Sequence, residues 1–124
     1  MDYISKFKVT EEMMVAFGEL SGDYNPVHID HNHATDKGFR GRVVYGGLII
    51  AQISRMIGME FPIDNMLWNG LKIDFIKPLM IGSNATIEAT LTHRSEATSS
   101  VMIHFQIFSE SITIAKGSIV ASIL

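Results

Sequence analysis

The sequence contains no cysteine, so neither a disulfide framework nor thiolate chemistry is available to it. It also lacks an excess of positive charge, because it has ten Lys and Arg and thirteen Asp and Glu. No block of basic residues is present that could bind the phosphate backbone of a nucleic acid. Nucleic acid is therefore not an expected partner. The longest apolar stretch, 43–59, is interrupted by polar side chains and is too short to span a bilayer, so no membrane association is expected.

Linkers, repeats and a secretory signal are missing too. Only three prolines occur, no stretch rich in Gly, Ser and Pro divides the chain, and the first residues lack a basic segment followed by an apolar one. With 47% hydrophobic and 19% charged residues in 124, the chain has enough apolar material for one core, which excludes a disordered protein. We therefore expect a single domain over residues 1–124, located in the cytoplasm.

The amino-terminal third predicts helices joined by an ordered loop. Thr10 followed by two glutamates has the composition of an N-cap and first turn, which predicts a helix over about 10–21. The segment 22–28 is dense in turn formers and predicts a loop. Beyond it, Asp30 can cap a short helix over about 31–37, which a glycine then ends in the left-handed conformation.

A second pattern predicts a helix wrapped by a sheet. Residues 48–59 are apolar on nearly every side, including both methionines at 56 and 59, so the helix they form must be covered. Successive runs then alternate between apolar and polar residues, which predicts an antiparallel meander with one buried face. A bulge near Gly117 would reconcile the two phases of the last run. The predicted fold is an α+β domain whose strands cover about 4–9, 71–75 (Leu71 and Phe75 facing inward), 85–92, 101–108 and 112–124.

Polar side chains that could perform chemistry concentrate in the loop. Asp23, Asn25 and His28 lie within six positions, beside Gly22 and Pro26. A carboxylate and an imidazole on one rigid loop can hold a water molecule and take its proton. Equally, Asp and Asn in loops often cap neighbouring backbone amides, and a loop histidine is often solvated. Residue types alone leave both interpretations open.

The run from Phe17 to His28, FGELSGDYNPVH, followed by five residues and Ala34, resembles the signature of the (R)-specific enoyl-CoA hydratases, also called MaoC-like dehydratases. The likeness extends through Gly38-Phe39, the entry to the long helix at 43–48, and 75–79. The resemblance implies the hot-dog fold, in which an antiparallel sheet curls around a long helix. This agrees with the architecture predicted from the periodicity.

The resemblance also implies an activity and roles for particular residues. The activity is (R)-specific hydration of trans-2-enoyl thioesters, or the reverse dehydration, without a cofactor or metal, by a homodimer acting on coenzyme A or acyl carrier protein thioesters. Asp23 and His28 would hold and activate the water, and Asn25 would shape the loop. The backbone N–H of Gly46 would bind the thioester oxygen. Ser54 would line the pocket, although a serine on the helix surface is an equal alternative.

Tyr45 departs from many relatives, which carry histidine before that glycine. If its ring faces the acyl tunnel, short acyl chains should be favoured, because an aromatic ring adds apolar bulk. If instead it packs as a structural residue, it sets no chain length.

Three other interpretations remain. The cluster of His and Asp over 28–33 contains common metal ligands, but its spacing matches no familiar zinc pattern. A hot-dog thioesterase would bind the same class of substrate and hydrolyse it. A non-catalytic module that binds acyl thioesters is also compatible with the fold.

Overall fold

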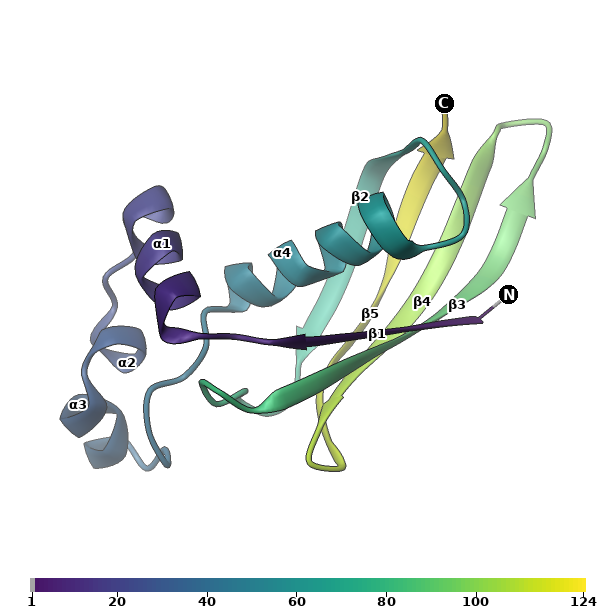
Figure 1. Cartoon of the computed structure of the whole chain (residues 1–124). Coiled ribbons are helices and arrows are strands. Elements are labelled where there is room, and N and C mark those ends of the chain that lie inside the picture. The colour runs from purple at the N-terminus through teal and green to yellow at the C-terminus, as the bar shows by residue number, and fades with distance from the viewer. Residues whose placement is uncertain (1) are drawn as a thin grey trace.

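The computed structural model describes residues 2–124, whose strands form an antiparallel sheet with one long helix across its inner face (Figure 1). This confirms the predicted α+β architecture. The spatial order is β1-β3-β4-β5-β2. The strands are β1 (Asp2–Lys8), β2 (Met66–Phe75), β3 (Asn84–Ser95), β4 (Ser100–Ser109) and β5 (Ile112–Ile123).

The helices begin where the capping residues predict. Thr10 accepts a hydrogen bond from Met13 N–H at the start of α1 (Glu11–Ser21), and Asp30 accepts one from His33 N–H at the start of α3 (His31–Asp36). The long helix α4 (Gly46–Arg55) starts two residues earlier than expected and continues as a π-helical turn, η1 (Met56–Glu60). No helix within residues 2–124 is long and apolar enough to cross a membrane.

The expectation of a loop over 22–28 is wrong in part, because α2 (Pro26–Ile29) begins inside it. Pro26 occupies the first helical position, where a missing N–H costs nothing. Asn25 stays non-helical and its side chain accepts from Val27 N–H at 3.3 Å, which caps the short helix. Asn25 and Pro26, residue types typical of loops, therefore start a helix here.

The meander predicted from successive runs places β2 next to β3, and this prediction is wrong as well. The meander consists of β3, β4 and β5, whereas β2 pairs with β5 and β1 pairs with β3. As an edge strand of the sheet formed within residues 2–124, β2 has no neighbouring strand on its far side. Its inward residues Leu71 and Phe75, which the alternation places in the core, are therefore 36% and 49% exposed.

The bulge in β5 exists but lies three residues before Gly117. Ile107 pairs with Ala115 and Phe108 pairs with Thr113, so Ile114 is the extra residue. Gly117 has a different role: a Cβ there would collide with the backbone carbonyl of Lys72 on β2 and approach the Phe105 ring at 2.8 Å. Glycine is required because two strands come unusually close.

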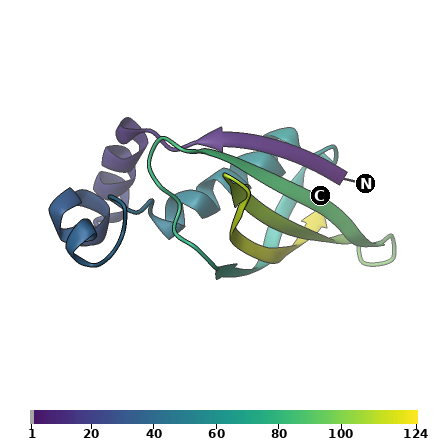
Figure 2. The same ribbon diagram turned by 90° about the horizontal axis from the view of Figure 1, so that it is seen from below.

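The core lies between α4 and the curved sheet, and Figure 2 shows the helix inside the curl. The buried face of α4 and η1 consists of Leu48, Ile49, Ile53, Met56 and Ile57. Each such side chain contributes about 1.5–3 kcal/mol relative to exposure. The sheet covers only this face, so the expectation that the helix is wrapped on nearly every side is wrong: Ala51 is exposed and Met59 is 83% exposed.

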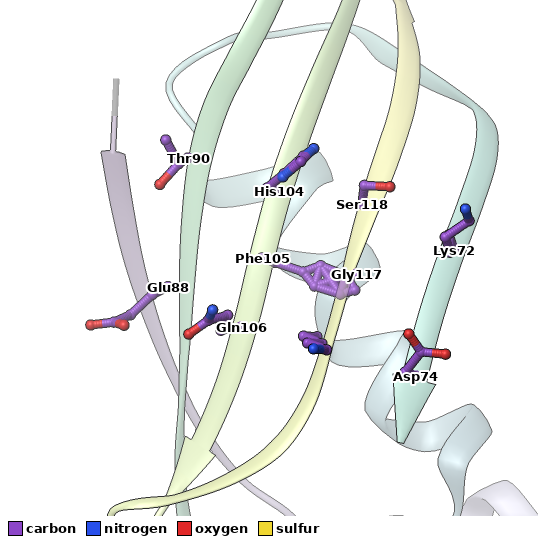
Figure 3. A pocket seen from close by; sticks show the side chains of 10 residues that line it. Lys72, Asp74, Glu88, Thr90, His104, Phe105, Gln106, Gly117 and Ser118 are labelled. Carbon is purple, nitrogen blue, oxygen red and sulfur yellow. The ribbon is translucent and has the colours of Figure 1, made fainter. Parts of the chain in front are cut away.

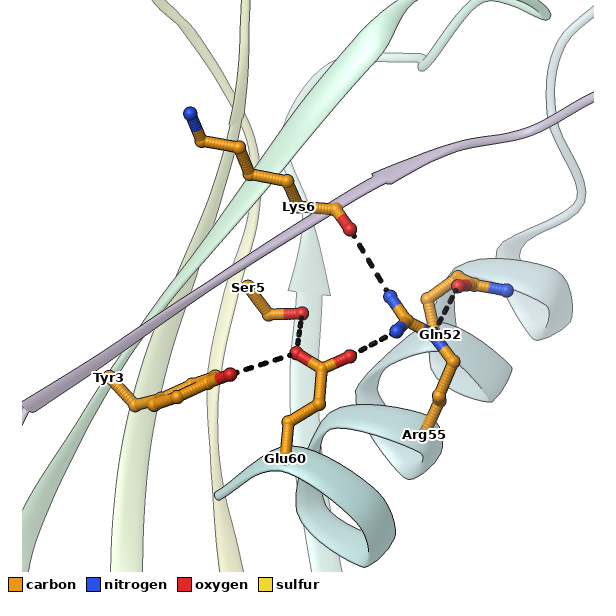
Figure 4. A network of polar contacts seen from close by, with 6 residues as sticks. All are labelled: Tyr3, Ser5, Lys6, Gln52, Arg55 and Glu60. Carbon is orange, nitrogen blue, oxygen red and sulfur yellow. Dashed lines mark hydrogen bonds and ion pairs between the residues drawn. The ribbon is translucent and has the colours of Figure 1, made fainter. Parts of the chain in front are cut away.

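A polar network ties the edge strand β1 to the end of the long helix (Figure 4). Glu60 accepts from the hydroxyls of Ser5 at 2.7 Å and Tyr3 at 3.2 Å, and pairs with Arg55. Arg55 in turn donates to the carbonyl oxygen of Lys6 at 3.2 Å. Burial and the carboxylate of Glu60 raise the pKa of Tyr3. This network fixes the strand that leads into the site-bearing helices.

Candidate functional site

His28 lies in α2 with a defined ring orientation. Its Nδ1 is 2.7 Å from the carbonyl oxygen of Val43, and Val43 N–H donates to the carbonyl of Val27 at 3.1 Å. A carbonyl oxygen can only accept, so Nδ1 carries the proton and Nε2 of the neutral ring is left as an acceptor. The half-buried imidazole is thus prepared to take a proton through Nε2.

Asp23 and Asn25 form a turn just before α2. Gly22 ends α1 with a φ of 75°, in the left-handed conformation that glycine adopts without a steric cost. Asp23 Oδ1 then accepts from Asn25 N–H at 3.0 Å, and the Asp23 side chain is exposed. The side chains of Asp23 and Asn25 therefore both cap neighbouring backbone amides, which is one of the two interpretations that the sequence leaves open. No hydrogen bond joins Asp23 to His28 in these described residues.

Gly46, the first residue of α4, shares a cavity of about 330 Å³ with His28. Phe75, Ile49 and Lys77 line the same cavity. No group in residues 2–124 accepts from the N–H of Gly46, and Tyr45 gives α4 no side-chain cap. Free N–H groups at a helix start, together with its positive dipole end, favour a negatively charged oxygen.

Tyr45 does not line this cavity. Its side chain is 1% exposed, its hydroxyl donates to the Asp23 carbonyl oxygen at 2.7 Å, and its ring lies against His28 with centroids 4.3 Å apart. Burial, and then the charge of Asp23, raise the pKa of Tyr45. The geometry is that of a packed residue, so the idea that its ring limits the acyl chain has no support from the cavity.

Ser54 lies two turns along α4 from Gly46, on the exposed face, and does not line the cavity either. The structure therefore brings His28 and Gly46 together and leaves Ser54 apart. Across residues 2–124, no group of three or more His, Cys, Asp and Glu is arranged to hold a metal ion. The His and Asp side chains over 28–33 are therefore not arranged as a metal site either.

Residues 2–124 also form other hollows, two of which bear on the candidate site. One of about 200 Å³ lies behind His28 and Tyr45, against α1. Another of about 460 Å³ lies on the outer face of the sheet, away from α4 (Figure 3). None of the predicted site residues lines this second hollow. Its polar lining comes from four strands and includes side chains of both charge signs: Lys72, Asp74, Glu88, Thr90, His104, Gln106, Lys116 and Ser118.

Sequence reasoning missed two contributors. Val43 acts through its backbone carbonyl, which no side-chain pattern reveals. Phe75 packs on Gly46, where an added Cβ would meet its ring at 3.1 Å. The only signal for Phe75 is its place in the run 75–79, which resembles the family but does not indicate contact with the site.

Comparison with known proteins identifies the family and the fold of this chain. A family model described as a MaoC-like domain matches residues 1–112. The chain is 30% identical over 79 residues to the (R)-specific enoyl-CoA hydratase of Aeromonas caviae, covering 64% of this chain and 59% of that enzyme. It is 33% identical over 73 residues to the mitochondrial 3-hydroxyacyl-[acyl-carrier-protein] dehydratase of Arabidopsis thaliana, covering 59% and 43%. These matches span about 60% or less of the curated relatives' lengths.

Solved structures show the same fold. The (R)-hydratase from A. caviae superposes with a TM-score of 0.92 at 23% identity, covering all of this chain and 95% of that one. An R-hydratase from Pseudomonas aeruginosa gives 0.90 at 22% identity, covering 99% and 79%. The hot-dog fold is thereby confirmed. Since the family model spans most of the sequence, the chain belongs to the MaoC-like domain family.

Proposed function

We propose that this protein hydrates trans-2-enoyl thioesters to (R)-3-hydroxyacyl thioesters, or catalyses the reverse dehydration. The observation that carries the proposal is one cavity holding both an imidazole with a free Nε2 and an unpaired helix N-terminus at Gly46. The names of the curated relatives, an enoyl-CoA hydratase and a 3-hydroxyacyl dehydratase, support the same reaction class.

The chemistry needs two devices, and the cavity offers both. Water attacks C3 of the conjugated thioester while Nε2 of His28 accepts one of its protons, and electrons move through C2 onto the thioester oxygen. The N–H of Gly46 donates to that oxygen, which carries the negative charge of the enolate. The imidazolium of His28 then gives that proton to C2, which restores both the thioester and the neutral imidazole. Acid-base groups of this kind contribute about 10²- to 10⁴-fold in rate.

Asp23 is the second acid-base group in this proposal. Oδ1 is occupied by Asn25 N–H, which leaves Oδ2 for the water. Asn25 shapes the turn by capping α2. Ser54 is proposed to contact substrate only if a second subunit extends the cavity toward the exposed face of α4.

We also propose a homodimer. The edge strand β2 leaves backbone groups unpaired on its outer side, and its inward residues Leu71 and Phe75 are partly exposed. Joining two such edges would pair the backbone and cover the apolar side chains. Because Phe75 packs on Gly46, a partner at β2 would border the catalytic cavity.

The substrate carrier is the finer part of the proposal, and coenzyme A and acyl carrier protein thioesters both fit the chemistry. The preference for short acyl chains, expected from a Tyr45 ring in the tunnel, is not part of the proposal, because Tyr45 does not line the cavity. The cytoplasmic location stays a prediction from the sequence.

The decisive experiment is a panel of trans-2-enoyl thioesters of four to twelve carbons on both carriers, followed by loss of the conjugated enoyl absorbance. We expect hydration, with an (R) product on chiral analysis, and no turnover by a folded His28→Ala control. Release of the free thiol carrier would instead favour a thioesterase. Binding without turnover would favour a non-catalytic module.

A further inference from the structure

We propose that Tyr45 is a positioning residue that holds both proposed catalytic groups, Asp23 through its hydroxyl and His28 through its ring. This inference rests on the proposed function and deepens it. Tyr45 does not border the cavity with Gly46, so its effect on the reaction passes through its two neighbours.

The hydroxyl anchors the turn that carries the carboxylate. Tyr45 Oη donates to the backbone carbonyl of Asp23 at 2.7 Å, across 22 positions of sequence. The other bonds of this turn are local: Asp23 N–H donates to Ser21 Oγ at 3.1 Å, and Asn25 N–H donates to Asp23 Oδ1. The hydroxyl of Tyr45 therefore donates the long-range hydrogen bond that fixes Asp23 relative to α4.

The ring supports the imidazole from behind. The rings of Tyr45 and His28 are 4.3 Å apart at an angle of 31°, and Phe17 lies 4.8 Å from Tyr45 on α1. Together with the bond from Nδ1 to Val43, this packing holds the orientation of the imidazole, which lines the same cavity as Gly46. Val43, Tyr45 and Gly46 lie within four residues, so one short segment sets the position of every proposed catalytic group.

Gly18 makes this arrangement possible. A Cβ at position 18 would lie 3.1 Å from Tyr45 Oη and 3.4 Å from the Tyr24 ring. Its φ is that of an ordinary helix residue, so the glycine is required by close approach and not by backbone conformation. An alanine there should displace the hydroxyl while leaving it in the molecule.

The test compares Tyr45→Phe with Tyr3→Phe. Both changes delete a hydroxyl with a long-range hydrogen bond, but Tyr3 bonds to Glu60, at the opposite end of the long helix from α2 (Figure 1). We expect Tyr45→Phe to lower kcat at least about tenfold with KM within twofold, since small misplacements of catalytic groups cost up to about a hundredfold. Tyr3→Phe should lower Tm and leave kcat unchanged. Tyr45→Leu, which also removes the ring, should lose more kcat than Tyr45→Phe.

Gly18→Ala supplies a second, independent variant. It should reproduce the fall in kcat in the wild-type background and have little further effect in the Tyr45→Phe background, because the clash involves the hydroxyl oxygen. Additive losses in the double variant would overturn the proposed mechanism.

A readout without turnover separates this inference from the proposed function. In Tyr45→Phe, amide hydrogen exchange at Asp23 and Asn25 should accelerate at least about tenfold, and in Tyr3→Phe it should not. Unchanged exchange, or a kcat within twofold of wild type while Asp23→Asn and His28→Ala are inactive, would overturn the role of Tyr45 alone. Near-normal turnover in those two variants would overturn the proposed function instead.

Discussion

The imidazole of His28 is held by the backbone carbonyl of Val43, 2.7 Å from Nδ1. This fixes the tautomer and leaves Nε2 as an acceptor, which in the proposed reaction takes a proton of the attacking water. We predict that His28→Ala and Asp23→Asn each reduce hydration of a four-carbon enoyl thioester at least about a hundredfold. Both residues are partly or fully exposed, so circular dichroism should show folded variants. Near-normal rates in either would remove that residue from the chemistry.

Gly46 provides the second prediction. Alanine at this position would bring a Cβ within 3.1 Å of the Phe75 ring and narrow the end of the cavity that is proposed to bind the thioester oxygen. Gly46→Ala should lower kcat by roughly a hundredfold, the contribution of one oxyanion donor. Gly58→Ala is the matched control, because its Cβ meets nothing within 4 Å. If both variants retain wild-type kcat, Gly46 does not bind the thioester oxygen.

The exposed edge of the sheet predicts the oligomeric state. Sedimentation equilibrium should give twice the chain mass of 13.8 kDa at micromolar concentration. A charged substitution on the edge strand, Leu71→Glu, should yield monomers and weaken turnover, whereas Leu20→Glu, at a fully solvated position on α1, should change neither. A single 13.8 kDa species in the wild type would contradict this prediction.

The Glu60 network predicts a stability effect without an effect on chemistry. Glu60→Ala leaves the hydroxyl of Ser5, which is 2% exposed, without its partner and Arg55 without its ion pair. Unfolding by urea should show a loss of about 1–3 kcal/mol, the cost of a buried unsatisfied polar group. The kcat of the folded fraction should stay near wild type. A loss below about 0.5 kcal/mol would show that the network does not hold β1.

Stability should also fall at alkaline pH. The folded-state pKa values of Tyr3 and Tyr45 are raised above 10.0, chiefly by burial, so the unfolded chain releases these protons first. Their contribution is complete below pH 10 and is lost as pH rises through the folded values. Urea titrations from pH 8 to 11 should show a declining free energy of unfolding, with a shallower decline in the Tyr3→Phe/Tyr45→Phe double variant. An equal slope in both proteins would contradict this.

Much of the fold was predictable because local signals and burial agree. Thr10 and Asp30 mark helix starts by capping, and the alternation in β3 and β4 matches a strand buried on one face. Strand order was not predictable, because the same alternation in β2 suits a central or an edge position. The position of the bulge at Ile114 was not predictable either. The change in the phase of the apolar alternation along β5 indicates that a bulge exists, but its position depends on how β5 pairs with β4.

The candidate site was predictable where side chains carry the signal and not where the backbone does. Asp23, Asn25, His28 and Gly46 stand out as residue types at particular spacings, and the structure places His28 and Gly46 on one cavity. The direction of the Tyr45 ring depends on packing against α1, which local sequence does not encode. The carbonyl of Val43 could belong to any residue, so nothing in its identity shows that it orients His28.

The pairing of β1 with β3 has a consequence for the order in which the molecule forms. The first strand pairs with residues 76 to 88 positions later, from Lys8 opposite Asn84 to Asp2 opposite Thr90, whereas β3, β4 and β5 are joined by short turns. Short-range pairing closes quickly and long loops close slowly, so the three-stranded meander should form first. During synthesis, β1 must wait until β3 has left the ribosome. The proposed catalytic residues Asp23, His28 and Gly46 lie within the loop that this late pairing closes, so we expect their positions to become fixed late in folding.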